Sequence, residues 1–210
     1  MVADEPTAVF AAVRKAARKL SRPLLKEIER IGPLTIDRPR VGPIAEHLYT
    51  AVVGQQLSVK AADTIWGRVV ALANAKKLTP GEMFVPGFED ELRLCGISRS
   101  KIKALNAIRT AQDEGQLDHR ELAGLAHPER SERLTAIWGV GRWTADMMGI
   151  FVFLDPDIWP DGDAAARGAL KRLTGREDTV AMAEGFAPHR SLLARYCWLS
   201  RDNAPTIGAG

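Results

Sequence analysis

Cysteine is scarce in this sequence, and its scarcity limits the metal and redox chemistry open to the chain. The 210 residues include two cysteines, Cys95 and Cys197, both in apolar stretches. Two cysteines cannot form a disulfide framework or a zinc-finger spacing. The four histidines are also too scattered to suggest a metal site. We therefore expect neither a disulfide scaffold nor a structural zinc ion.

Long apolar runs are missing as well. No stretch approaches the roughly 20 apolar residues that a membrane-spanning helix needs, and the N-terminal residues lack the apolar core of a signal peptide. We expect no membrane partner and a cytoplasmic location, associated with the nucleoid if the protein is bacterial.

Sustained strand alternation is absent, whereas helical periodicity recurs along almost the whole chain. Ser58 and Ser98 stand where helix N-caps are expected, and Pro23 suits a first helical turn. The sequence therefore predicts an all-α fold. The expected helices cover residues 7–20, 23–32, 43–53, 58–73, 79–85, 88–94, 98–114, 119–126, 129–138, 142–154, 164–173, 179–186 and 188–200.

Positive charge is in slight excess and unevenly distributed. The net charge is +3 and the isoelectric point is near 9.0, which permits a polyanionic partner without requiring one. Two basic clusters stand out, Arg14, Lys15, Arg18, Lys19, Arg22 and Lys26, and then Arg99, Lys101, Lys103 and Arg109. Either cluster alone also fits an ordinary solvated helix face.

The most informative stretch runs from Leu134 to Asp163. Gly139 and Gly141 bracket Val140 in a tight turn, and a new apolar helix begins at Arg142. The free amides of a helix N-terminus attract anions, phosphate above all. Taken alone, the turn fits a helix C-cap equally well.

Three motifs in order make the stretch more specific: GQQLS at 54–58, GVGRWTA at 139–145 and WPDGD at 159–163. In this order they resemble the helix-hairpin-helix DNA glycosylases, and Trp143 narrows the resemblance to the 3-methyladenine DNA glycosylase II group. The resemblance covers residues 43–202, with the helix-hairpin-helix at about 134–150.

The resemblance implies two helical lobes with a cleft between them. Residues 1–44 and 161–210 would form a terminal lobe, and residues 45–160 a central lobe that contains the hairpin. Some relatives carry an N-terminal β-domain, for which the residues before the first shared helix leave no room.

The resemblance also identifies Asp163 as the catalytic carboxylate, with Arg167 one helical turn later. Cleavage of an N-glycosidic bond builds positive charge on the deoxyribose, which a fixed anion stabilises. Without the resemblance, Asp163 would be interpreted as a helix N-cap.

Trp143 occupies the position where bifunctional relatives have a nucleophilic lysine. Without an amine there is no Schiff base and no strand cleavage, so we expect a monofunctional hydrolase. Trp143 and Met147 would line the base pocket. Phe186 would join them, at a place where relatives often have tryptophan. Plain core packing is the alternative for Trp143.

Two further groups of residues would contact DNA. Gln56, assisted by Leu57, would fill the gap left by a flipped base. The amides of Gly139 and Gly141, with Arg142, would bind a phosphate. In the family, main-chain carbonyls of the hairpin hold a monovalent cation, Na⁺ or K⁺, and here these belong to Thr135, Ile137 and Val140.

Together these features predict a monomeric enzyme that acts on damaged double-stranded DNA. It would excise alkylated purines such as 3-methyladenine and 7-methylguanine by base flipping and leave an abasic site. It would need no organic cofactor, and two cysteines cannot hold the iron–sulfur cluster of some relatives. Two alternatives are a non-catalytic helix-hairpin-helix module that binds DNA, and a glycosylase for another damaged base such as uracil.

Overall fold

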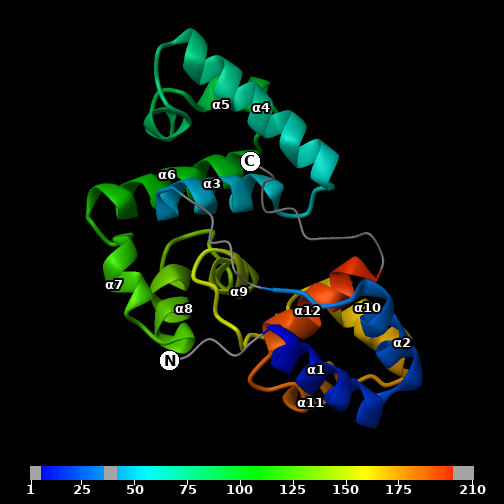
Figure 1. Ribbon diagram of the computed structural model, residues 1–210. Coiled ribbons are helices and arrows are strands. Elements are labelled where there is room, and N and C mark those ends of the chain that lie inside the picture. Colours follow the sequence, from blue (N-terminus) through cyan, green and yellow to red (C-terminus); the bar gives the residue numbers. More distant parts are fainter. Residues whose placement is uncertain (1–5, 36–41, 201–210) are drawn as a thin grey trace. The chain divides into compact units, whose positions relative to one another are not determined.

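The structure is a computed structural model that describes residues 6–35 and 42–200. These residues form helices joined by short loops, with no strand among them (Figure 1), so the predicted all-α fold is confirmed. The elements are α1 (Pro6–Leu20), α2 (Arg22–Ile31), α3 (Ile44–Gly54), α4 (Val59–Ala75), the 3₁₀ helix η1 (Pro80–Met83), α5 (Glu89–Leu94), α6 (Arg99–Asp113), α7 (His119–Ala123), α8 (His127–Thr135), α9 (Arg142–Phe151), α10 (Ala164–Thr174), α11 (Thr179–Glu184) and α12 (Arg190–Leu199).

Local capping sets many of these boundaries where the sequence places them. The hydroxyls of Ser58 and Ser98 accept hydrogen bonds from the amides of Ala61 and Lys101, each at 3.3 Å. One expected helix is different: in place of a helix over residues 79–85, the structure has the short 3₁₀ helix η1 (Pro80–Met83), with a capping box between Thr79 and Glu82. None of the helices in the described residues is long and apolar enough to span a membrane.

The chain divides into two compact units. Among the described residues, unit 1 contains 6–35 and 149–200, and unit 2 contains 42–148. Residues 149–160, which the sequence analysis placed in the central lobe, thus belong with the terminal helices. The lobe boundaries implied by the resemblance remain a prediction.

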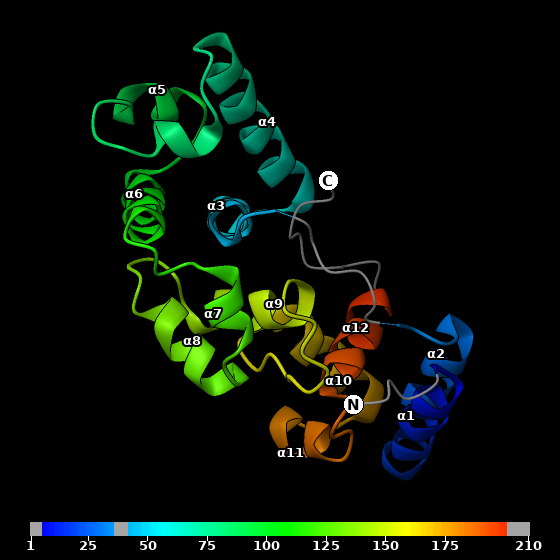
Figure 2. The same ribbon diagram turned by 60° about the vertical axis from the view of Figure 1, so that its left-hand side comes forward.

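Unit 2 is organised around α3, which packs against α4 and α6 (Figure 2). Eight of the residues in α3 are buried, as expected for a helix that is covered on several sides. The Tyr49 ring meets the edge of Phe84 with 4.6 Å between centroids. The C-terminal end of this buried helix leads directly into the GQQLS turn.

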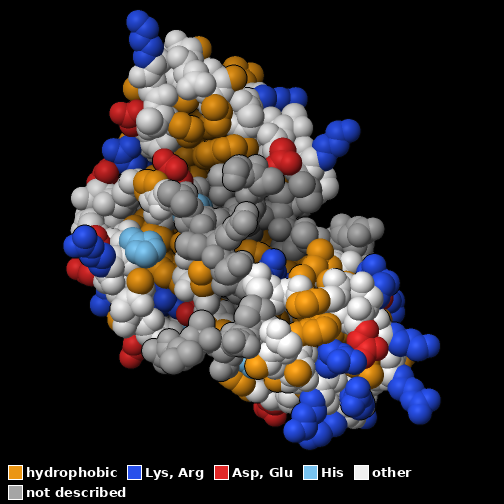
Figure 3. Space-filling view, viewed as in Figure 1, with side chains coloured by type: hydrophobic (Ala, Val, Ile, Leu, Met, Phe, Trp, Pro, Cys, Tyr) orange, Lys and Arg blue, Asp and Glu red, His pale blue; other side chains and the backbone are white. Residues whose placement is uncertain are grey.

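Unit 1 is built from α10, α12 and α2, with α1 packed on α2. Trp198 of α12 is 2% exposed and stacks on Phe151, with 5.6 Å between ring centroids. Basic side chains gather over α1 and α2 (Figure 3). Of this cluster, Arg14 pairs with Glu29, whereas Arg18, Lys19 and Lys26 are exposed.

The turn between α8 and α9 lies unusually close to α6. Gly139 has φ +87°, a backbone conformation that side chains with a Cβ rarely adopt. A Cβ built there would overlap the Ala104 Cβ and lie 3.2 Å from the Ala104 Cα. Glycine is therefore required at position 139 for two reasons: the positive φ of the backbone and the close approach to α6.

We predict that Gly139→Ala destabilises unit 2 by about 2 to 5 kcal/mol. This figure combines roughly 1 to 2 kcal/mol for the left-handed backbone with about 1 to 3 kcal/mol for overpacking. Denaturant unfolding followed by circular dichroism measures the change.

The matched control is Gly141→Ala, because that glycine has no positive φ and nothing within 4 Å of an added Cβ. It should alter the unfolding free energy by no more than about 0.5 kcal/mol. Adding Ala104→Gly to Gly139→Ala should restore the packing part of the loss. Equal stability of the two alanine variants would contradict this account of the turn.

Candidate functional site

Asp163 is held by hydrogen bonds at the N-terminus of α10. Its Oδ1 accepts from the Ala166 amide at 2.7 Å and from the Trp198 indole Nε1 at 2.9 Å. The residue is 6% exposed. Asp163 is thus an N-cap, as its position suggests, and it is also a buried carboxylate oriented by a second helix. No sequence pattern links Asp163 to Trp198, because the two residues are far apart in the chain.

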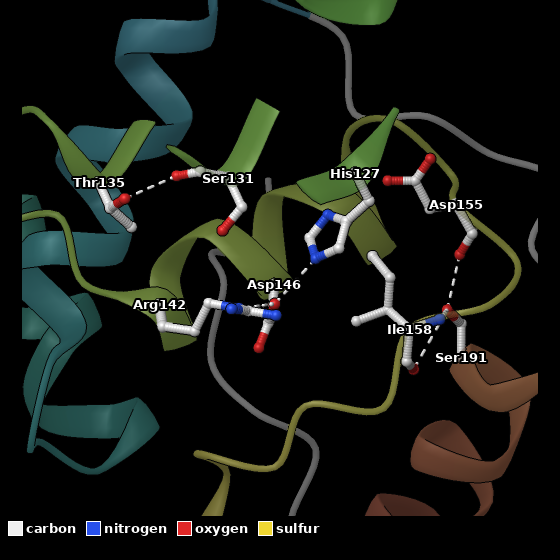
Figure 4. Close-up of polar contacts among 8 residues, drawn as sticks. All are labelled: His127, Ser131, Thr135, Arg142, Asp146, Asp155, Ile158 and Ser191. Atoms are coloured by element: carbon white, nitrogen blue, oxygen red, sulfur yellow. Dashed lines mark hydrogen bonds and ion pairs between the residues drawn. The ribbon is translucent and has the colours of Figure 1, made fainter. Parts of the chain in front are cut away.

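The loop before Asp163 is fastened to the start of α12. Arg190 Nε and Nη2 donate to the two carboxylate oxygens of Asp157 at 2.7 and 2.9 Å. The Ser191 hydroxyl donates to the Asp155 carbonyl at 2.6 Å and accepts from the Ile158 amide at 3.0 Å (Figure 4). These bonds fix the backbone that positions Asp163.

Arg167, the basic residue expected one turn after Asp163, forms an ion pair with Asp161. Its Nε is 3.7 Å from Asp161 Oδ1, and the same oxygen accepts from the Thr179 hydroxyl at 3.1 Å. Asp161 therefore links the loop to α10 and α11.

The hairpin presents unpaired main-chain amides in unit 2. Val140 N donates to the Ile137 carbonyl at 3.0 Å and closes the turn, and the Gly141 carbonyl accepts from Ala145. Within the described residues, the amides of Gly139 and Gly141 donate no hydrogen bond. They adjoin the N-terminus of α9, where the helix dipole also favours an anion.

The carbonyls expected to hold a cation differ in the hydrogen bonds that they accept. Those of Thr135 and Val140 accept no hydrogen bond within the part of the chain that the structure describes, while the Ile137 carbonyl accepts the one from Val140. A carbonyl oxygen has two lone pairs, so all three retain capacity for a cation. The described residues contain no cluster of three or more His, Cys, Asp or Glu side chains that could bind a metal ion.

Asp146 holds the two helices of the hairpin together. Its Oδ1 lies 2.9 Å from His127 Nε2 at the start of α8 and accepts from Arg142 Nε at 3.2 Å (Figure 4). Asp146 is 3% exposed, whereas the Arg142 side chain is 73% exposed. Arg142 is thus anchored at its Nε, and most of its side chain is exposed to solvent at the N-terminus of α9.

The GQQLS turn is tied to both α6 and the hairpin. Lys101 Nζ donates to the carbonyls of Val53 and Gln55 at 2.7 and 2.9 Å, and burial lowers the pKa of this lysine. The side-chain Nε2 of Gln55 donates to the Gly139 carbonyl at 3.2 Å and to the Thr144 hydroxyl at 3.3 Å.

The turn presents Gln56 and Leu57 to solvent. Gln56 is exposed and has φ +59°, and Leu57 is 37% exposed. A left-handed conformation at a residue other than glycine is strained, and it persists where the surroundings fix it. The bonds from Lys101 and Gln55 supply that restraint. From the sequence, Lys101 fits a solvated helix face and Gln55 has no predicted role. Their hydrogen-bond partners are distant in the chain, so no local pattern reveals them.

The three residues expected to line the base pocket differ in exposure. Trp143 is partly exposed at the first turn of α9, whereas Met147 is fully buried in unit 2. Phe186 is 3% exposed and lines a hollow of about 370 Å³ in unit 1 with Lys19, Leu20 and Met182. Their contact with a base remains a prediction.

Comparison with known proteins identifies relatives of this chain. No protein-family model matches the sequence. The DNA-3-methyladenine glycosylase 1 of Schizosaccharomyces pombe is 35% identical over 161 residues, which cover 73% of this chain and 70% of that protein. The alkylbase DNA glycosidase-like protein mag2 of the same yeast is 26% identical over 181 residues, 81% of this chain and 84% of the relative.

Solved structures agree with the sequence comparison. The S. pombe 3-methyladenine DNA glycosylase in complex with abasic DNA superposes with a TM-score of 0.77 at 29% identity, over 92% of this chain and 98% of that one. A DNA-3-methyladenine glycosidase from Bacillus halodurans gives a TM-score of 0.72 at 27% identity, over 93% of each chain.

We predict that Asp157→Asn lowers the melting temperature of the 210-residue protein by about 2 to 4 °C at pH 7. This corresponds to roughly 1 kcal/mol for a partly exposed ion pair. Arg190 holds the pKa of the Asp157 carboxyl below its ordinary value of 3.8. The stabilisation is therefore complete above that value and is lost as the pH falls through the lowered pKa.

Melting curves of wild type and Asp157→Asn at pH 7 and near pH 2 test this expectation. The two proteins should converge at the acid end. Asp178→Asn is a suitable control, because asparagine can keep the cap that Asp178 provides to the Ala181 amide. A difference between wild type and Asp157→Asn that persists at acid pH would show that the ion pair is not its source.

Proposed function

Because the chain belongs to the 3-methyladenine DNA glycosylase family, we propose that it hydrolyses the N-glycosidic bond of alkylated purines in damaged double-stranded DNA. Its substrates would be of the 3-methyladenine and 7-methylguanine type, and its product an abasic site. The observation that carries the proposal is the buried Asp163, with one carboxylate oxygen bonded to both Ala166 and Trp198.

The chemistry requires an anion whose place is fixed before the substrate arrives. Positive charge grows on the deoxyribose as the base departs, so a nearby carboxylate stabilises the transition state more than the ground state. At about 4 Å and an effective dielectric of 20, this is roughly 4 kcal/mol, or about a thousandfold in rate. The hydrogen bonds to Asp163 limit the reorganisation that would reduce this gain.

Alkylated purines suit a pocket with few polar groups. Their positive charge is attracted to an electron-rich ring, which Trp143 would supply, with Met147 and Phe186 in supporting positions. Trp143 also stands where a lyase would have its lysine, so we propose a monofunctional enzyme that does not cut the strand.

DNA would be held at two places in unit 2. The amides of Gly139 and Gly141, with the anchored Arg142, would bind a backbone phosphate, and Gln56 with Leu57 would enter the base stack. A Na⁺ or K⁺ ion on the hairpin carbonyls would add positive charge beside that phosphate. We further propose that the enzyme acts as a monomer in the cytoplasm.

The first test measures base release. We expect the wild type to release 3-methyladenine and 7-methylguanine from methylated duplex DNA, and Asp163→Asn to do so about a thousandfold more slowly. Asparagine can retain the N-cap, so circular dichroism should show both proteins equally folded. Strand nicks should appear only after alkali.

A folded wild type that binds the duplex but releases no base, from this DNA or from uracil-containing DNA, would replace this proposal with a non-catalytic DNA-binding module. Release of uracil alone would make the protein a glycosylase for a different damaged base. Nicks before alkali would contradict the monofunctional mechanism.

A second test concerns the orientation of Asp163. Trp198→Phe removes the indole donor but keeps an aromatic ring against Phe151. We expect a tenfold lower single-turnover rate of base release, the equivalent of about 1.4 kcal/mol, with unchanged affinity for DNA. Phe151→Leu is the packing control, since it disturbs the same stack without touching the donor. An equal loss in both variants would assign Trp198 a packing role only.

A further inference from the structure

One large aromatic side chain of the hairpin is not explained by the packing of the protein. Trp138, directly before Gly139, is 46% exposed, and it is the one aromatic residue among the exposed large hydrophobic side chains of the described residues. Tryptophan is enriched among the residues that dominate binding interfaces, so its exposed indole beside a proposed ligand site is a candidate for contact with the ligand.

Lys103 lies against this tryptophan. Its Nζ is 4.3 Å from the centroid of the Trp138 ring, and no carboxylate pairs with it within the described part of the chain. Two other basic residues of α6 have partners within the protein. Lys101 donates hydrogen bonds to carbonyls of α3 and of the turn after it, and Arg109 forms an ion pair with Asp113. Lys103 therefore keeps a positive charge that is exposed and held in place by a ring.

The fold places this pair beside the hairpin amides. Gly139 packs on Ala104, so the residues adjoining them in the chain, Trp138 and Lys103, meet next to that contact. The same close approach that shapes the turn thus brings a basic and an aromatic side chain to its edge.

We propose that Trp138 and Lys103 form an additional contact with the DNA backbone, next to the phosphate bound by the hairpin. Lys103 pairs with a phosphate, and the indole packs against the adjoining deoxyribose. The bases of a duplex are stacked, whereas the sugars offer an accessible apolar face. This inference rests on the proposed function and adds a binding site to it.

The decisive measurement is the salt dependence of binding to a duplex with a tetrahydrofuran abasic-site analogue, which the enzyme cannot hydrolyse. Fluorescence anisotropy gives the association constant between about 50 and 200 mM salt. For Lys103→Gln we expect the slope of log K against log salt to become shallower by about 0.9, the value for one lost phosphate contact.

The matched control is Lys77→Asn, which also removes one positive charge from unit 2. Lys77 follows α4, whose 17 residues span about 25 Å from the GQQLS turn, and asparagine tolerates its φ of +61°. This control should keep the slope of the wild type.

Trp138 is tested by two variants in the same assay. Trp138→Ala should weaken binding about tenfold, as expected if roughly 50 Å² of apolar ring surface is covered by the sugar. Trp138→Phe should recover most of the loss. Neither variant should change the salt slope as Lys103→Gln does, because neither removes a charge.

The outcomes separate this inference from the function on which it rests. A wild type that neither binds the duplex nor releases methylated bases would end the proposed function. A wild type that does both, while Lys103→Gln keeps its salt slope and Trp138→Ala binds within twofold, would overturn the backbone contact alone. The exposed Trp138–Lys103 pair would then be assigned to contact with another protein and not with DNA.

Discussion

The close approach of Gly139 to Ala104 is the constraint on which the proposed DNA-binding part of unit 2 depends. Gly139 has no side chain at this contact, so the hairpin backbone lies directly against the Ala104 methyl group of α6. Its position is thereby set by a rigid helix and not by a loop. The free amides and carbonyls of the hairpin and the Trp138–Lys103 pair all adjoin that one contact.

In unit 1 the corresponding constraint is the attachment of the acidic loop to α12. Arg190 and Ser191 hold the loop at its beginning, and Trp198 holds Asp163 at its end. The carboxylate therefore has little freedom to rotate toward solvent. A catalytic anion needs this rigidity, because electrostatic stabilisation is greatest where the charge does not have to reorganise.

The sequence predicted the helices and their caps because these depend on local patterns. Ser58, Ser98 and Asp163 cap the helices they precede, and Gly139 has the positive φ that the turn requires. The relation of Asp163 to chemistry came from the resemblance and not from its position, which fits a simple cap equally well.

What the sequence could not predict depends on residues far apart in the chain. Lys101 belongs to a basic cluster that fits a solvated helix face, yet its Nζ donates to carbonyls at the end of α3 and in the turn that follows. The partners of Gln55 lie more than 80 positions away, and Trp198 reaches Asp163 from another helix. Hydrophobic periodicity indicates which face of a helix is buried. It does not indicate which polar atoms of a distant segment will lie within hydrogen-bond distance of that helix.

The restraint of the GQQLS turn has a consequence for how DNA binding is driven. Lys101 and Gln55 fix the turn from two sides, so Gln56 is held on a stiff frame before any duplex is present. The conformational entropy of this segment is lost when the protein folds and not when it meets DNA. If Gln56 enters the base stack as proposed, the turn does so without changing its own conformation. The free energy needed to unstack the bases then comes from contacts with the DNA backbone.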